Sequence, residues 1–431
     1  MSKQRTINLL GAISIGVGGM VGGGIFAVLG EAVSLAHGAT AVAFLVAGFV
    51  ALLTSYSYAK LSVAFQSEGG TVTFVDGAFG HNILSGSVNL MLWLSYIVTI
   101  SLYAVAFASY GATFFTDAGT ITKHVLISTA IVLPAMINLI SASFVSKSET
   151  LIVVLKIVLL LVIIFASISY VDTERFSPQN WGTNLSIVVA GMIIFVAYEG
   201  FELIANAAEE IQDPQKNLPR AFYASVIFVI ILYIAIALIS VGTVDEKTLL
   251  EAKDYALAIA AKPALGQVGF TLVSVAALLA TFSAINATIY GNARLGFFIA
   301  SEGELPKVLT HSKNNIPFMG VLITLALSLF LANSINIDEI AIIGSASFLL
   351  IFFIVNLSAL KLYKSLNANR YLLIFSSLAT LMALVTLLFH TYSSNPKAIY
   401  IFSSFLVVSF VFEYFYGRLV RGHLFKRNYK V

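Results

Sequence analysis

The chain has 431 residues, of which 59% are hydrophobic and only 10% are charged, and its mean hydropathy is +0.94. Soluble globular proteins carry about 25% charged residues, so this composition excludes a soluble protein and predicts an integral membrane protein. The lack of cysteine excludes disulfides and thiolate metal sites.

Apolar segments recur along the whole chain, and none shows the period-2 alternation of a membrane barrel strand. Segments of this length and composition predict membrane-spanning helices. The expected fold is therefore an all-α integral membrane protein with twelve transmembrane helices. The segments are 9–29, 39–65, 83–115, 124–145, 148–170, 185–211, 221–242, 267–298, 317–333, 338–360, 371–390 and 398–417.

The first segment is rich in glycine in its middle. Six glycines fall between Gly16 and Gly24, and glycine costs roughly 1 kcal/mol relative to alanine inside a helix, so we expect the helix to break there. Broken backbone at membrane depth is tolerated only where protein buries it or a cavity reaches it, which makes the break half of a candidate transport site. The alternative is close helix packing through small residues four apart, such as Gly18 and Gly22, and the two interpretations are compatible.

The sixth segment contains a second interruption, with Glu199, Gly200 and Glu202 at membrane depth. Two interrupted helices in corresponding positions of two halves point to the binding site of a transporter. Because these segments are five crossings apart, and five is an odd number, the two halves must insert in opposite orientation. The spacing predicts a 5+5 inverted repeat with discontinuous helices 1 and 6.

We therefore expect one transmembrane transport domain over residues 1–431. Its parts are a first repeat over about 8–170, a second repeat over about 185–360, two added helices over about 371–417 and a tail over 418–431. Twelve crossings place both termini on one side. The bias of Lys and Arg toward that side predicts a multi-pass protein of the cell membrane with both termini cytoplasmic. The expected partners are the lipid bilayer and a solute, without nucleic acid and without an obligatory protein partner.

Five stretches resemble the amino acid–polyamine–organocation (APC) superfamily and occur in that family's order. They are GVGGMVGGGIF from Gly16, Glu68-Gly69-Gly70, Tyr198-Glu199-Gly200-Phe201-Glu202, Glu209 to Ala221, and Asn292-Ala293-Arg294 followed by Glu302 to Pro306. The resemblance covers roughly residues 8–310 and implies the LeuT-type fold and amino-acid transport. The chain departs from the family's pattern at the Gly-Gly pair, which lacks the flanking proline and tyrosines, and at Glu199.

The glycine break suits an α-amino acid, which carries one carboxylate and one ammonium group. The N–H groups of Gly22, Gly23 and Gly24 would begin a half-helix and are candidates to bind the carboxylate, because glycine has no Cβ to keep a ligand away. The carbonyl groups of Gly19 and Met20 are candidates to bind the ammonium. The resemblance implies the same positions.

The sixth segment would supply the other wall of the site. The carbonyl groups of Val196 and Glu199 are candidates to bind the ammonium. Glu202 either gates the site or caps the second half-helix. The Glu199 carboxyl group either favours a cationic substrate, or carries a coupled proton, or pairs with a polar neighbour. The remaining candidates to line the pocket are Gly200, Phe201, Tyr96 and Ser101.

Lys156 lies in the apolar run TLIVVLKIVLLLVIIF. It either snorkels to the inner interface or lies between segments one, five and eight. In proton-coupled members of the resembled family, a helix-five lysine similar to this one replaces the sodium ion of sodium-coupled relatives. The resemblance implies contacts from Lys156 to the Gly18 carbonyl and to the hydroxyl of Thr281 or Ser283. It also implies the proton as coupling ion, with no sodium site and no cofactor.

Weaker expectations concern the ends of helices six and eight, where Glu209 and Glu210 are candidates to form an inner gate with Arg294. The histidines show no ligand spacing on one helix face, so we expect no metal site. The sequence contains no nucleophile–base pair that would indicate an enzyme, so we do not expect an enzyme. The sequence predicts a secondary active transporter, a proton-coupled symporter of amino acids that works by alternating access. The alternatives are an amino-acid exchanger or a polyamine/amine transporter, and a sensor that binds solute without moving it.

Overall fold

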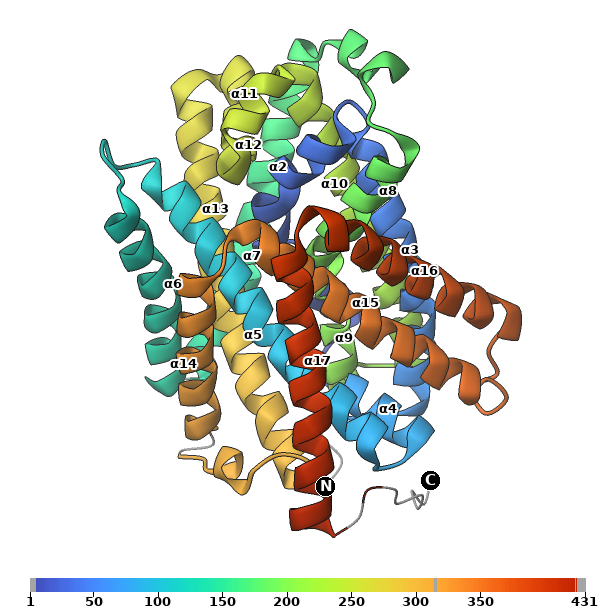
Figure 1. Ribbon diagram of the computed structural model, residues 1–431. Coiled ribbons are helices and arrows are strands. Elements are labelled where there is room, and N and C mark those ends of the chain that lie inside the picture. Colours follow the sequence, from blue (N-terminus) through green and yellow to red (C-terminus); the bar gives the residue numbers. More distant parts are fainter. Residues whose placement is uncertain (1–4, 141, 314–315, 423, 425–431) are drawn as a thin grey trace.

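The computed structural model describes residues 5–140, 142–313, 316–422 and 424, and over 142–150 it describes the backbone alone. In these ranges the chain forms helices and isolated bridges but no strand (Figure 1). The helices are α1 (Leu9–Met20), α2 (Gly24–Ala36), α3 (Thr40–Ala64), α4 (Thr71–Phe79), α5 (Ile83–Ala112), α6 (Thr120–Ile140), α7 (Ala142–Ser167), α8 (Asn184–Ile193), η4 (Ile194–Tyr198), α9 (Leu203–Asn206), η5 (Ala208–Glu210), α10 (Pro214–Thr243), α11 (Glu246–Glu251), η6 (Lys253–Tyr255), α12 (Ala256–Ala260), α13 (Lys262–Ser301), η7 (Lys307–Thr310), α14 (Phe318–Ser334), α15 (Ile337–Lys361), α16 (Arg370–Ser394), α17 (Pro396–Tyr416) and η8 (Gly417–Arg421), besides three short 3-10 turns between α7 and α8.

The helices coincide with the predicted apolar segments to within a few residues at most ends. Among the described residues, ten helices are long and apolar enough to cross a membrane, and the bent pair α1 and α2 makes an eleventh candidate span. Helix α14 has 17 residues, fewer than the about 20 that a crossing takes. The all-helical, multi-pass membrane protein is confirmed. The twelfth crossing and the inverted repeat stay predictions.

Local sequence sets several helix ends. The Asn82 side chain caps α5, because its Oδ1 accepts a hydrogen bond from the N–H of Leu84 at 2.8 Å. Helices α10 and α17 begin at Pro214 and Pro396, where the missing N–H and the fixed φ of proline suit the first turn. The starts of these three helices are therefore fixed by local sequence.

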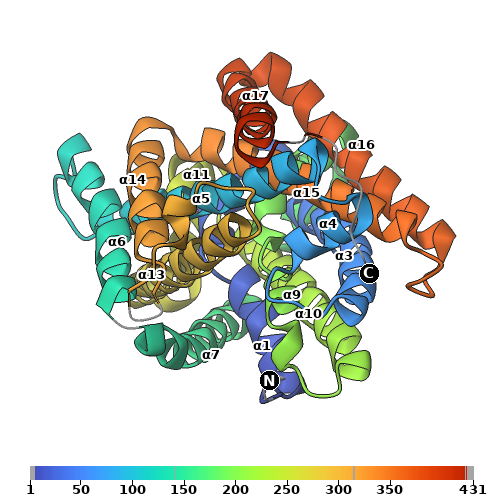
Figure 2. The ribbon, with the colours of Figure 1, turned by 90° about the horizontal axis from the view of Figure 1, so that it is seen from below.

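Seen from below, α6, α7, α16 and α17 lie at the margin of the bundle (Figure 2). These helices expose large apolar side chains, among them Phe165, Phe389 and Val408, which marks them as lipid-facing in a membrane protein. Helices α5 and α15 are largely buried, as is the span from Asn184 to Asn206 that contains η4. The interrupted segments therefore lie inside the bundle.

The two ends of the bundle differ. We call the end that holds α4 the lower end and the end that holds α11 and α12 the upper end (Figure 1). Helix α4 lies at the lower end, and the short helices α11 and α12 lie on the upper surface.

Candidate functional site

The glycine-rich segment is broken. Helix α1 ends at Met20, α2 begins at Gly24, and the two axes are bent by 49°. The glycines admit neighbours that a side chain would displace: a Cβ on Gly23 would lie 2.7 Å from Cγ of Tyr103, and a Cβ on Gly24 would lie 2.7 Å from Cα of Ala197. The interruption expected at the glycines is present, and the unwound residues between the two half-helices are buried.

The sixth predicted segment is broken as well. Helix α8 passes into η4, which ends at Tyr198, and α9 begins at Leu203. Gly200 in the intervening turn has φ +120°, a conformation that side chains rarely allow. A Cβ on Gly200 would lie 2.6 Å from the backbone nitrogen of Met20, and one on Gly19 would lie 2.9 Å from Cα of Gly200. The two breaks therefore touch, backbone to backbone.

Tyr233 of α10 links the two breaks. Its hydroxyl group donates to the carbonyl of Met20 at 2.7 Å and to that of Ala197 at 3.1 Å. On the far side, the Ser345 hydroxyl of α15 accepts a hydrogen bond from the N–H of Val196 at 2.9 Å and donates to the carbonyl of Ile193 at 2.5 Å. Sequence reasoning missed Tyr233 and Ser345. A hydroxyl group inside a long apolar helix needs a partner, but the sequence does not say which.

These bonds also bear on two carbonyl groups predicted to meet an ammonium. The Met20 carbonyl already accepts from Tyr233, and the Val196 carbonyl accepts from the N–H of Glu199 at 3.2 Å. A carbonyl oxygen has two lone pairs, so each retains capacity for a second donor. The ring of Phe201 is fully buried against Tyr58, with the ring centroids 5.4 Å apart.

Both carboxyl groups of the second break are buried and face α5. Glu202 accepts from the hydroxyl group of Tyr96 at 3.2 Å and from the N–H of Gly200 at 2.8 Å. The carboxyl group of Glu199 accepts from the hydroxyl group of Thr99 at 3.5 Å. Of the two predicted α5 residues, Tyr96 therefore reaches the break. The Ser101 hydroxyl donates to the carbonyl of Ile97 and, at 3.4 Å, to that of Ser328 on α14.

Lys156 of α7 lies beside the first break. Its side chain is 3% exposed, and its ammonium donates to the carbonyl of Gly18 at 3.0 Å. Burial at this depth argues against a lysine that extends to the interface. On α13, the hydroxyl group of Thr281 donates to the carbonyl of Ala277 at 2.7 Å, and Ser283 is buried on the same helix. A link from Lys156 to either hydroxyl stays a prediction.

A pocket of about 430 Å³ lies between α1, α9 and α13 toward the lower end. The predicted gate residues Glu210 and Arg294 both line it, and the Arg294 guanidinium stacks on the ring of Tyr290 at 4.5 Å. Glu209 precedes Glu210 in η5. The lining includes Ile15 and Leu203 but none of the residues of the two breaks. A salt bridge between these acids and Arg294 stays a prediction.

Three charged side chains form ion pairs at the upper end and link η6 to α2 and α15. The Lys253 ammonium in η6 pairs with Glu31 of α2 and, at 2.8 Å, with Asp338 of α15. Burial alone would lower the pKa of Lys253, but the two carboxylates raise it above its usual value. Gly30 lets the loop rest on α2, since a Cβ there would lie 2.7 Å from the Lys253 carbonyl carbon. We call Glu31, Lys253 and Asp338 the upper triad.

Two interrupted helices in contact at the centre of a multi-pass bundle are typical of secondary transporters, so the fold and the site define a membrane permease. Residues 7–415 match the model of the amino acid permease family. The chain belongs to the amino acid permease family, which is a family of transporters.

Three similar proteins are transporters by name. The inner membrane transport protein YbaT of Escherichia coli is 33% identical over 411 residues, which cover 94% of this chain and 95% of YbaT. The methylthioribose transporter of Bacillus subtilis is 25% identical over 383 residues, and the branched-chain amino acid permease BcaP of the same organism is 23% identical over 385 residues. Each of these two matches covers 84% of this chain and 82% of the relative. The family and these relatives bear out the expected APC permease.

Proposed function

We propose that the chain is a proton-coupled symporter of amino acids that binds its substrate where the two broken helices meet. The observation that carries this proposal is the contact between the breaks at Gly19 and Gly200. The first hydrogen bond within α2 runs from the N–H of Ala27 to the carbonyl of Gly23, so the N–H groups from Gly24 onward begin a half-helix without partners inside it. Such N–H groups, at the positive end of a helix dipole, suit a substrate carboxylate.

In this proposal the substrate ammonium meets the carbonyl of Gly19 and the wall formed by Glu199 and Glu202. Both breaks are buried in protein, which fits non-helical backbone at membrane depth. The two Bacillus subtilis relatives are named for different substrates, methylthioribose and branched-chain amino acids. Since these differ, the proposal extends to the amino-acid class and to no particular side chain.

Lys156 is the proposed proton carrier. Its bond to the Gly18 carbonyl joins α7 to the half-helix that ends at the break. Moving α1 away would leave the ammonium with fewer acceptors and a changed solvation, and both change the balance between charged and neutral lysine. Protonation and conformation would then be linked, as coupled transport requires. In this mechanism no sodium ion and no cofactor take part.

We further propose the LeuT-type arrangement, with twelve crossings in two inverted five-helix repeats and two added helices, in the cell membrane. The lower end would face the cytoplasm. The pocket lined by Glu210 and Arg294 lies toward that side and would join the site once the lower end opens, while the upper triad would keep the other side closed. In alternating access, the upper end would open while the lower end closes, and the reverse.

A second candidate function is transport or exchange of an amine or polyamine. The specific observation in its favour is the pair of carboxyl groups, Glu199 and Glu202, buried beside the breaks. Ionised carboxylates at membrane depth are costly unless they meet a partner, and a substrate with two ammonium groups would supply one. Counterflow without net uptake by the wild-type protein would favour exchange, and binding without any flux would favour a sensor.

The deciding experiment is uptake by sodium-free proteoliposomes under an inward proton gradient, screened over amino acids and polyamines. We expect Lys156→Met to reduce gradient-driven accumulation roughly tenfold or more, because it removes a charge-assisted hydrogen bond of about 1.5–3 kcal/mol and the titrating group itself. Counterflow, which needs no net proton movement, should persist in the variant. The exposed Lys364, changed to Met, is the matched control.

Accumulation by Lys156→Met at the wild-type level would contradict the coupling role. Strict dependence of wild-type uptake on sodium would contradict proton coupling altogether. Substrate binding should be measured in the same preparations, so that a loss of uptake is separated from a loss of fold.

A further inference from the structure

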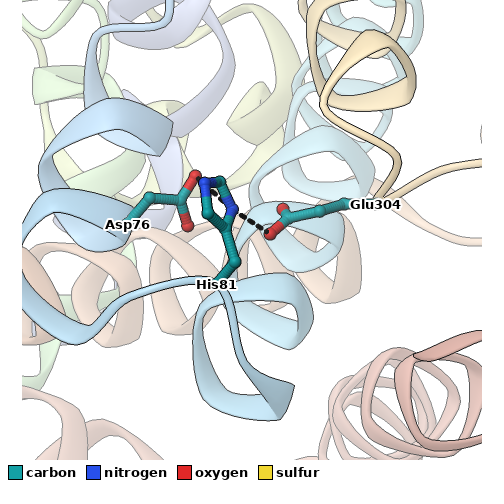
Figure 3. A group of neighbouring side chains, drawn as sticks. All are labelled: Asp76, His81 and Glu304. Carbon is teal, nitrogen blue, oxygen red and sulfur yellow. Dashed lines mark hydrogen bonds and ion pairs between the residues drawn. The ribbon is translucent and has the colours of Figure 1, made fainter. Parts of the chain in front are cut away.

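A second cluster of polar side chains lies at the lower end, away from the two breaks. Asp76 of α4, His81 of the connection between α4 and α5, and Glu304 beyond α13 converge there (Figure 3). Figure 3 shows the imidazole of His81 between the two carboxyl groups. Its Nδ1 lies 3.1 Å from Oε1 of Glu304 and 3.8 Å from Oδ2 of Asp76.

We propose that Asp76, His81 and Glu304 bind a divalent transition-metal ion, with the amide oxygen of Asn89 as a fourth donor. The three donor atoms lie within 4.8 Å of one another. Ligands about 2.1 Å from a tetrahedral ion lie about 3.4 Å apart, so the observed separations need only small side-chain rotations. Two carboxylates with one imidazole suit Mn²⁺, Fe²⁺ or Zn²⁺ better than Mg²⁺ or Ca²⁺.

The proposed fourth donor is the buried side chain of Asn89. Its side chain is fully buried, and its amide nitrogen donates to Asp76 at 3.1 Å and to Glu304 at 2.7 Å, so the carboxamide points into the cluster. Its Oδ1 has no hydrogen-bond partner among the residues that the structure describes. A buried amide oxygen without a partner is unfavourable. Rotating the amide would place this oxygen between two carboxylates, which is favourable only with a cation there.

The charges around the cluster favour a divalent cation. Arg421 pairs with Glu413 and lies 3.8 Å from Glu304, so one buried guanidinium stands against three buried carboxyl groups, those of Asp76, Glu304 and Glu413. With all three carboxyl groups ionised, one negative charge remains in excess if the imidazole of His81 is charged, and two remain if it is neutral, as a metal ligand must be. A divalent ion would neutralise the excess.

The backbone holds the donors in place, and solvent can reach them. The Ser85 hydroxyl donates to the carbonyl of Gly80 at 2.7 Å, which fixes the connection that carries His81. The N–H of Glu304 donates to the carbonyl of Ile299 at 3.0 Å. The His81 side chain is 25% exposed, whereas those of Asp76 and Glu304 are nearly buried. An ion would therefore enter past the imidazole and join α4, α5 and the end of α13.

The test is metal binding by the full-length protein, purified in detergent and stripped with a chelator. We expect calorimetric titration with Zn²⁺ or Mn²⁺ to show one ion per chain, and saturating ion to raise the melting temperature, whereas Mg²⁺ should do neither. Asp76→Asn and His81→Ala should each weaken binding at least tenfold. The matched control is His311→Ala, an exposed histidine that bonds within its own turn at the lower end.

Asn89→Asp is the complementary variant, because it places a carboxylate oxygen where the amide nitrogen now bonds to Asp76 and Glu304. We expect it to bind Zn²⁺ more tightly than the wild type, and this gain does not depend on the other variants remaining folded. The proposal is overturned if the wild type binds neither Zn²⁺ nor Mn²⁺. It is also overturned if Mg²⁺ binds as well, or if Asp76→Asn and His81→Ala bind like the wild type. Transport is not the readout, so failure here leaves the transport proposal standing.

Discussion

The two breaks at the centre of the molecule are built in different ways. The first, between α1 and α2, is made of glycines, and its polar groups belong to the backbone. The second, between η4 and α9, carries two buried carboxyl groups and one glycine with φ +120°. A substrate bound between them would meet backbone on one side and side chains on the other. In the proposed function, the first side would recognise what all amino acids share, and the second side would be free to vary with the substrate.

The largest effect is expected where the two breaks touch. Gly200→Ala forces an alanine into a conformation that costs on the order of 1–3 kcal/mol, and its Cβ would lie 2.6 Å from the backbone of Met20. We expect uptake to be lost and the melting temperature to fall. Gly119→Ala is the control, since no atom lies within 4 Å of its added Cβ. Wild-type uptake by Gly200→Ala would mean that the breaks separate without loss of function.

The next largest effect distinguishes the two carboxyl groups. Glu202 accepts hydrogen bonds from the hydroxyl group of Tyr96 at 3.2 Å and from the backbone of the break at 2.8 Å, whereas the Thr99 hydroxyl lies 3.5 Å from Glu199. Hydrogen bonds to charged groups contribute about 1.5–3 kcal/mol, so we expect Glu202→Gln to lower substrate affinity by roughly ten- to a hundredfold. We expect Glu199→Gln to lower it less and to shift preference away from cationic substrates. Equal losses in a binding assay would show that the two acids are not distinct.

The smallest effect concerns the link between the breaks. Tyr233→Phe removes a hydroxyl group that donates to both Met20 and Ala197, and a neutral hydrogen bond contributes about 1 kcal/mol. We expect a drop of a few degrees in melting temperature and a modest loss of uptake. Tyr400→Phe on the lipid-facing side of α17 is the control. A melting temperature equal to that of the wild type would mean that water replaces the lost donor.

The sequence predicts a feature well when the residues that form it are neighbours in the chain. The break at the glycines and the helix spans depend on runs of neighbouring residues, and they were predictable. The approach of Lys156 to Gly18 was expected through the resemblance to a family. The bonds of Tyr233 and Ser345 join residues far apart in the chain, as does the cluster of Asp76, His81 and Glu304. No periodicity records such contacts, because they depend on how whole helices pack.

The upper triad has a mechanical consequence. The loop that carries Lys253 rests on α2 at Gly30, and its ammonium reaches both Glu31 of α2 and Asp338 of α15. The loop and the half-helix are therefore joined to each other, and the ion pair of Lys253 with Asp338 fastens the loop to α15. If α2 swings outward, it either carries the loop with it or releases that fastening first. The energy of one partly exposed ion pair, which salt screens, would then set how readily the upper end opens.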